Sequence, residues 1–210
     1  MQIEYFRGTE SVALNGGGMQ SSHPVSLHEA IQRRRSVYAF LNAPVPRGVV
    51  ERALDLAVLA PCHHQTHPWR FFVFEGAGRE RLATAYKAAA ERLGMLPEKA
   101  IQRAYDAPVM IAIVCQPMLK HPRVKQWEEE FATTAATQTL MLALSAAGVG
   151  TLLTTGSLPE SVEVRRLLGL DQPEAKMMGV LNVGYRNPER PLMARPAASA
   201  SAATHWISAS

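Results

Sequence analysis

The chain has 210 residues, of which 47% are hydrophobic and 19% are charged, so one folded domain with a sizeable core is expected. This composition excludes a disordered or collagen-like chain, and two cysteines, Cys62 and Cys115, provide no disulfide framework. The formal net charge of +4 comes from scattered cations with one run of three arginines, which favours a small anionic ligand over nucleic acid.

The two ends of the chain differ from its middle. Residues 1–24 contain no signal-peptide core, so we expect no export. Three consecutive glycines break this stretch, so we expect residues 1–24 to be a flexible extension outside a single domain at 25–195. Residues 196–210 form an alanine- and serine-rich tail. Two cysteines without a framework favour the cytoplasm. Residues 131–159 carry no charge, but polar residues and glycines interrupt them, so no membrane span is expected.

The first half of the chain predicts helices before and after one strand. Ser26 and Glu29 form a capping box that opens a helix over 27–36, with the basic triplet in its last turn. A second helix follows from Pro46 to about residue 58, and Pro61 ends it. Residues 60–69 are a loop, 70–75 a strand, 79–93 a helix, and 97–108 a helix or turn.

The second half predicts three more strands and a long helix. Residues 108–117 form a continuous apolar run, as expected for a strand covered on both faces. A helix over 124–147 would be about 36 Å long. Strands at 149–156 and 176–185 flank an amphipathic helix over 158–170. The pattern therefore predicts four strands among about six helices.

Two charged runs have more than one interpretation. "RRRSV" at 33–37 places cations at a helix C-terminus, where they are favourable, but arginine forks followed by a serine also suit a phosphorylated ligand. "WEEEF" at 127–131 places three carboxylates at a helix start, where they complement the helix dipole.

The stretch "APCHHQTHPW" at 60–69 places Cys62, His63, His64 and His67 in one loop. Zinc ligands usually come from two separated segments, and four ligands from one short loop are crowded. We expect no metal site, with a metal-binding protein kept as an alternative. No Walker loop, HExxH, paired CxxC or GxSxG motif occurs, which excludes several hydrolase and metalloenzyme classes.

Four stretches, in order, carry a resemblance: "AIQRRRSVYAF", "APCHHQTHPWRFFVFEGAGRERL", "VKQWEEEFATTAATQTLMLALSAAGVGTLLTTG" and "VLNVGY". Together they resemble the flavin-dependent nitroreductase superfamily, in its compact bacterial branch, over about residues 27–188. The resemblance implies an α+β fold, with a small central, mainly antiparallel sheet of about four strands flanked by helices. It also implies an intertwined homodimer with FMN at two interface sites.

The resemblance assigns cofactor-binding roles residue by residue. Arg34, Arg35 and Ser36 match the element that holds the FMN phosphate and ribityl chain, and Arg195 resembles a late basic residue used on the phosphate. Tyr38 stands where the family often has a cation.

Other matched residues belong near the flavin ring. Leu153, Thr154 and Thr155 match the segment that lies against the ring. His63 matches a loop histidine that reaches the flavin bound mainly by the partner chain, and Cys62 replaces the usual aspartate before it.

The implied activity is an NAD(P)H-dependent oxidoreductase that reduces nitroaromatic or quinone-like acceptors in a two-step exchange. No catalytic side chain is required, because the flavin carries the chemistry. Alternatives are another FMN chemistry of the superfamily, such as dehalogenation, ring fragmentation or azoline oxidation, and a flavin-binding protein without turnover.

Overall fold

The computed structural model describes residues 25–208, so the predicted extension at 1–24 lies outside the described residues. No helix within 25–208 is long and apolar enough to cross a membrane. The predicted single domain at 25–195 and the tail at 196–210 stay predictions.

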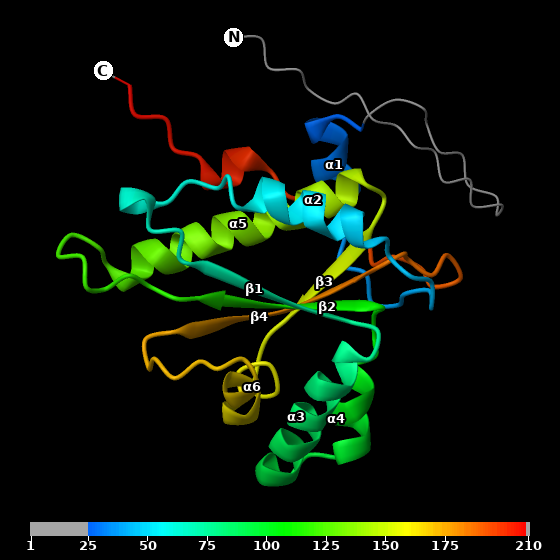
Figure 1. The fold of residues 1–210 in the computed structure, drawn as a ribbon. Helices are drawn as coiled ribbons and strands as arrows, with labels where there is room; N and C mark the ends of the chain where they lie inside the picture. The colour runs from blue at the N-terminus through cyan, green and yellow to red at the C-terminus, as the bar shows by residue number, and fades with distance from the viewer. Residues whose placement is uncertain (1–24, 209–210) are drawn as a thin grey trace.

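The centre of the fold is a four-stranded antiparallel sheet with strand order β1-β2-β4-β3 (Figure 1). All seven side chains of β2 are buried, as its continuous apolar run predicts, because helices cover both faces of the sheet. The strands are β1 (Trp69–Glu75), β2 (Val109–Cys115), β3 (Gly150–Thr154) and β4 (Lys176–Gly184). The predicted α+β class and four-stranded sheet are confirmed, whereas the intertwined dimer stays a prediction.

One face of the sheet is covered by α5 (Gln126–Ala146) and α2 (Arg47–Ala57), with α1 (Leu27–Arg33) against the C-terminal half of α5 (Figure 1). Helix α5 has small and apolar residues on most of its circumference, so it packs on the sheet, on α2 and on α1 at once. Its buried leucines, Leu140 and Leu144, join the core made with β2 and β4.

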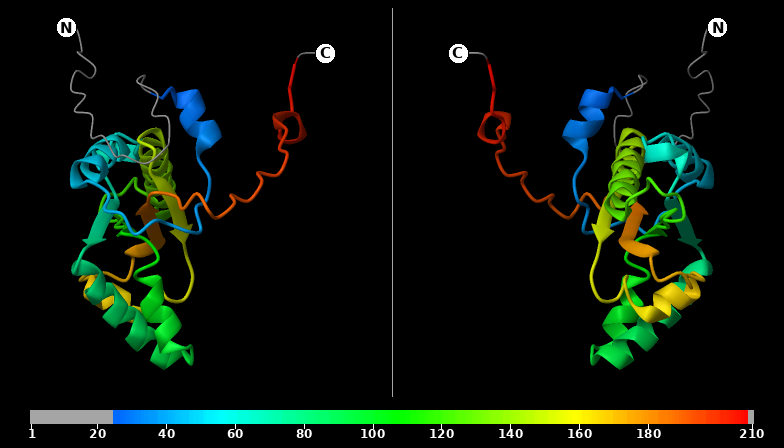
Figure 2. Two further views of the ribbon diagram at one scale, coloured as in Figure 1. Left: turned by 90° about the vertical axis from the view of Figure 1, so that its right-hand side faces the viewer. Right: turned by 90° about the vertical axis from the view of Figure 1, so that its left-hand side faces the viewer.

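The opposite face is covered by α3 (Gly78–Leu93), α4 (Pro97–Arg103) and α6 (Val162–Leu167) (Figure 1). Two short 3₁₀ turns complete the described chain, η1 (His63–Gln65) before β1 and η2 (Ala200–Ala203) near the end. Residues 187–195 stay against the segment that follows α1, and the chain beyond them runs away from the body of the domain (Figure 2).

The first helix is shorter than predicted. Its start is confirmed, because the Ser26 hydroxyl accepts from the Glu29 amide at 3.2 Å and the Glu29 carboxylate accepts from the Ser26 amide at 3.1 Å. Its end is different, since the helix stops at Arg33 and Arg34 already has the extended ψ of 126°. Placing the whole triplet in the last turn was wrong; Arg34 and Arg35 begin the next segment.

The end of β3 lies unusually close to β4 because Gly179 has no side chain. A Cβ at this position would lie 2.7 Å from the carbonyl oxygen of Thr154 and 3.2 Å from Thr155 Cγ2, and its φ is +132°. Only glycine adopts this backbone conformation without strain. Gly179 therefore allows the Thr154–Thr155 segment to lie where it does.

We expect Gly179→Ala to lower the free energy of unfolding by about 3 kcal/mol or more, because backbone strain and a clash with backbone add together. Gly169→Ala is the matched control: φ is +65°, but nothing lies within 4 Å of its Cβ. That variant should lose only about 1 kcal/mol. Denaturant unfolding of both variants tests this. Equal losses of unfolding free energy would show that the close approach of the two strands adds nothing to the cost of the substitution.

Candidate functional site

The segment that follows α1 is fixed to the first residues of β3. The amide of Val37 donates to the carbonyl of Thr151 at 3.0 Å, and Ser36 forms a parallel bridge with the same residue. Gly150 leaves room for this docking, because a Cβ there would lie 2.8 Å from Val37 Cγ2. The docking places Arg34 and Arg35 beside the start of an edge strand.

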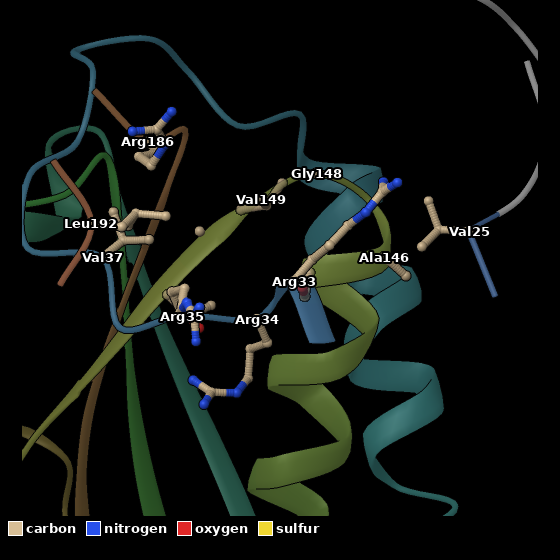
Figure 3. Close-up of a pocket in the computed structure, with 13 residues that line it drawn as sticks. Val25, Arg33, Arg34, Arg35, Val37, Ala146, Gly148, Val149, Arg186 and Leu192 are labelled. Carbon is tan, nitrogen blue, oxygen red and sulfur yellow. The ribbon is translucent and has the colours of Figure 1, made fainter. Parts of the chain in front are cut away.

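A cavity of about 230 Å³ lies at this junction (Figure 3). The arginine triplet lines it together with the loop that joins α5 to β3. Further cationic character comes from Arg186, which follows β4. Other lining residues are Val37, Ser145, Gly148, Val149 and Thr151.

Arg34 and Arg35 lack an anionic partner, since neither forms a salt bridge within residues 25–208. Burial lowers the pKa of Arg34 most, and the positive charges of Arg195 and Arg35 lower it further. The Nη1 atom of Arg35 is buried without any hydrogen-bond partner. Partly buried guanidinium groups without a partner can be satisfied by a bound anion, so both residues fit a phosphate group.

The third arginine of the triplet is different. Arg33 Nη2 donates to Glu29 Oε1 at 3.1 Å on the exposed side of α1. Figure 3 shows its side chain extending away from the guanidinium groups of Arg34 and Arg35. The triplet is therefore divided into one helix-stabilising cation and a pair that an anion can bridge.

The remaining residues assigned to the phosphate region lie nearby but not all in this cavity. Arg195 Nη2 donates to the carbonyl of Arg34 at 2.7 Å, which fixes the C-terminal segment against the end of α1. Ser36 lines an adjacent cavity of about 410 Å³, together with Tyr38, Arg186 and other residues.

Sequence reasoning missed Arg186, which lines both cavities. It is brought there by an antiparallel bridge with Phe40 directly after β4. The available signal was a cation shortly after the last strand. Its place at the cavities depends on the bridge to Phe40, which the sequence pattern does not show.

The predicted segment at the end of β3 presents its side chains to two sides. Leu153 pairs with Leu181 and is exposed on the α5 face of the sheet. Thr154 pairs with Val180 on the other face, and its hydroxyl donates to the Val180 carbonyl at 2.9 Å. Leu153 is thus available to a ligand beside the edge strand on the α5 side, and Thr155, directly after the strand, is exposed.

The histidine loop does not gather its side chains around one point. Cys62 Sγ lies 4.0 Å from His67 Nδ1, whereas the His64 ring stacks on His121 with centroids 4.6 Å apart. His63 is exposed. Within residues 25–208, no three His, Cys, Asp or Glu side chains are placed to hold a metal ion.

A buried carboxylate holds this loop. Glu129, on α5, is 0% exposed, and its Oε1 accepts from the Thr66 hydroxyl at 2.6 Å. Its Oε2 accepts from the amide of Met118 at 3.1 Å. Glu129 lies in the first turn of α5, as the helix-dipole interpretation expects, but it has a second role that was not predicted, because loops from elsewhere in the chain donate to it.

The loop needs such a tie because its backbone is strained. His64, Gln65 and His67 have φ values of 53°, 52° and 48°, which non-glycine residues rarely adopt. Each costs on the order of 1–3 kcal/mol and persists only where the surroundings impose it. Thr66 lies among these three residues, so its bond to Glu129 helps to fix their conformation.

One chain does not bring the arginine pair and His63 together. The loop is tied to Glu129 in the first turn of α5, while Ser145 in the last turn lines the arginine cavity. These two positions are about 24 Å apart at ~1.5 Å per residue. The sites assigned to a single cofactor therefore lie at opposite ends of the longest helix.

The fold and the arginine cavity define a class: a small α+β domain with a cationic cavity, of a kind that fits a phosphate group, beside an edge strand. The model of the Nitroreductase family matches residues 31–185, so the chain belongs to that family, as predicted. "Putative NAD(P)H nitroreductase YdjA" of Escherichia coli K12 is 34% identical over 161 residues, covering 74% of this chain and 86% of the relative.

Solved structures show the same fold. A nitroreductase-like family protein from Bacillus cereus superposes with a TM-score of 0.77 at 22% identity, covering 91% of this chain and all of that one (100%). The FMN-dependent nitroreductase NfnB from Mycobacterium smegmatis, solved in complex with NADPH, has a TM-score of 0.66 at 21% identity, covering 87% and 100%.

Replacing Glu129 by alanine should lower the free energy of unfolding by about 3 kcal/mol, because two hydrogen bonds to a buried side chain are lost and their donors are left without a partner. The neighbouring Glu130→Ala is the control, since Glu130 pairs with Lys176 at the surface. It should cost no more than about 1 kcal/mol. Denaturant unfolding gives both values.

Hydrogen exchange locates the effect. We expect faster exchange of the Thr66 and Met118 amides in Glu129→Ala, with little change at β2. Unchanged protection of both amides would contradict the role of Glu129 in holding the loop.

Proposed function

We propose that the chain is one subunit of an FMN-dependent oxidoreductase that takes electrons from NAD(P)H and reduces nitroaromatic or quinone-like acceptors. The observation that carries the proposal is the pair Arg34 and Arg35, which are partly buried, uncompensated within the described chain, and oriented about a cavity. The names of the relatives support the same cofactor and electron donor.

The residues of this chain would bind and orient the cofactor. Arg34 and Arg35 would hold the phosphate, Ser36 would reach the ribityl chain, and the segment Leu153 to Thr155 would lie against the ring through Leu153, since Thr154 points to the other face. Arg195 would act by fixing the backbone of Arg34, to whose carbonyl it donates. When bound, FMN supplies the hydride and electron transfer in two successive half-reactions.

We propose that each site uses two chains, with His63 of one chain completing the site that holds the other chain's arginines. The separation along α5 supports this, because a single chain leaves His63 far from the cation pair. Exposed apolar side chains also support a partner chain: Trp127 and Phe131, four residues apart on α5, are 61% and 68% exposed.

The extended C-terminal segment supports an intertwined assembly. It leaves the body of the domain (Figure 2) and carries Trp206 and Ile207, which are 91% and 100% exposed. Large apolar side chains on an extended arm are stabilised when a second chain covers them. We keep the cytoplasm as the proposed location, because the two cysteines are free.

Purified protein should therefore be yellow, dimeric in solution, and able to oxidise NADH or NADPH in the presence of a nitroaromatic or a quinone. A colourless protein that acquires no flavin absorption with added FMN would overturn the proposal.

The cation pair can be tested against its neighbour in the triplet. Arg35→Ala should weaken FMN binding about 10- to 100-fold, since a charge-assisted hydrogen bond contributes about 1.5–3 kcal/mol. Arg33→Ala should change it by less than about threefold, because Arg33 is paired with Glu29 on the helix surface. Titration followed by flavin fluorescence measures both, and equal losses would contradict the assignment.

Mixing two variants that are each expected to be impaired tests the shared site. If Arg35 and His63 belong to different chains of one site, an Arg35→Ala/His63→Ala heterodimer has one intact site and one doubly altered site. Random exchange of subunits should then restore about one quarter of the wild-type sites. Turnover and bound flavin after unfolding and refolding the mixture give the measurement, with each variant refolded alone as the control. No recovery in a mixture shown to contain heterodimers would place both residues in one chain's site.

A further inference from the structure

An asparagine interrupts the apolar layer between the sheet and helices α3, α4 and α6. Asn182, on β4, pairs with Met110 on one side and Leu152 on the other, so all three side chains point to that layer. Asn182 is 2% exposed, and its Oδ1 is buried without a hydrogen-bond partner. Its Nδ2 makes no hydrogen bond to another described residue. An amide without partners in such a layer is unfavourable, and a leucine would fit the pattern of the strand better.

The amide lies at the wall of a cavity of about 320 Å³. The deep part is lined by buried residues: Tyr86 from α3, Met110 from β2 and Leu158. The Tyr86 phenol makes no hydrogen bond to the rest of the described chain, and burial raises its pKa, so it stays a neutral donor. The volume is within the range of small-molecule sites, at its lower end.

This cavity is separate from the arginine site. It lies on the face of the sheet covered by α3 and α6, whereas Leu153 points to the α5 face. The two sites share only the strand between them, since Thr154 and Thr155 line the cavity from the β3 side. No residue of the arginine triplet lines it.

We propose that this cavity binds a small neutral molecule of the carboxamide or cyclic-imide class, whose amide group pairs with the side-chain amide of Asn182. An asparagine amide carries donors and an acceptor side by side, and a ligand amide presents the complementary pair. A half-turn of the side chain exchanges Oδ1 and Nδ2, so either group can face the ligand.

The charges at the mouth favour a neutral ligand. Arg103 and Asp106 are both exposed there, so opposite charges face the entrance and neither sign dominates. The deep wall offers apolar contacts from Met110 and Leu158, which suit the flat body of a single ring. The unpaired polar groups, Asn182 and Tyr86, then fix its orientation.

Benzamide is a suitable probe, and methyl benzoate is its matched control, since it keeps the ring and carbonyl but lacks the N–H donor. With FMN-loaded protein, we expect benzamide to bind with a dissociation constant of about 1 mM and to shift the Asn182 side-chain resonances in ¹H–¹⁵N spectra. Methyl benzoate should bind at least tenfold more weakly.

Asn182→Leu is the matched variant. It removes the unpaired amide and so should fold, with an unfolding temperature about 2–4 °C above that of the wild type, while losing at least tenfold in benzamide affinity. The proposal is overturned if benzamide shifts only resonances around Arg35 and Leu153, if it does not saturate because the cavity holds water alone, or if Asn182→Leu binds it as well as the wild type. A yellow protein that fails these tests leaves the proposed flavin function unaffected.

Discussion

Helix α5 sets the geometry on which the two halves of the candidate site depend. Its C-terminal turn forms a wall of the arginine cavity, and its first turn holds the histidine loop through Glu129. Because a helix has a fixed rise per residue, the two groups cannot approach each other within one chain. A cofactor that needs both would have to be bound between chains, which is why the proposed function requires a dimer.

The charged side chains at the two ends of α5 differ in whether they have hydrogen-bond partners. At the C-terminal end, unpaired carbonyl groups give a negative partial charge, which favours the nearby arginines but does not replace an anion. Arg35 Nη1 keeps an unmet donor there. At the N-terminal end, each carboxylate oxygen of Glu129 accepts a hydrogen bond, one from Thr66 and one from Met118. The C-terminal end therefore has a donor left for a ligand, while at the N-terminal end Glu129 holds the loops of the chain in place.

The helices and strands could be predicted because their signals are local. The apolar run of β2, the capping box at Ser26 and the length of α5 each depend on neighbours in the sequence. The predicted end of α1 was wrong because Ser36 and Val37 are held by Thr151, more than a hundred positions away in the sequence. The second role of Glu129 was missed for the same reason, since its donors lie on two other loops. Tertiary partners of this kind leave no periodic pattern in the sequence.

Strand β3 connects the arginine site with the Asn182 cavity because successive side chains of a strand point to opposite faces. Leu153 belongs to the side assigned to the flavin, and Thr154 belongs to the cavity behind it. Gly179 brings β4 so close to this segment that little movement of either strand is possible without the other. A ligand that shifts Thr154 would thus shift Leu153 as well. Coupling between two binding sites is reciprocal. If a ligand in the cavity changes the affinity for flavin, flavin would therefore change the affinity of the cavity for that ligand by the same factor.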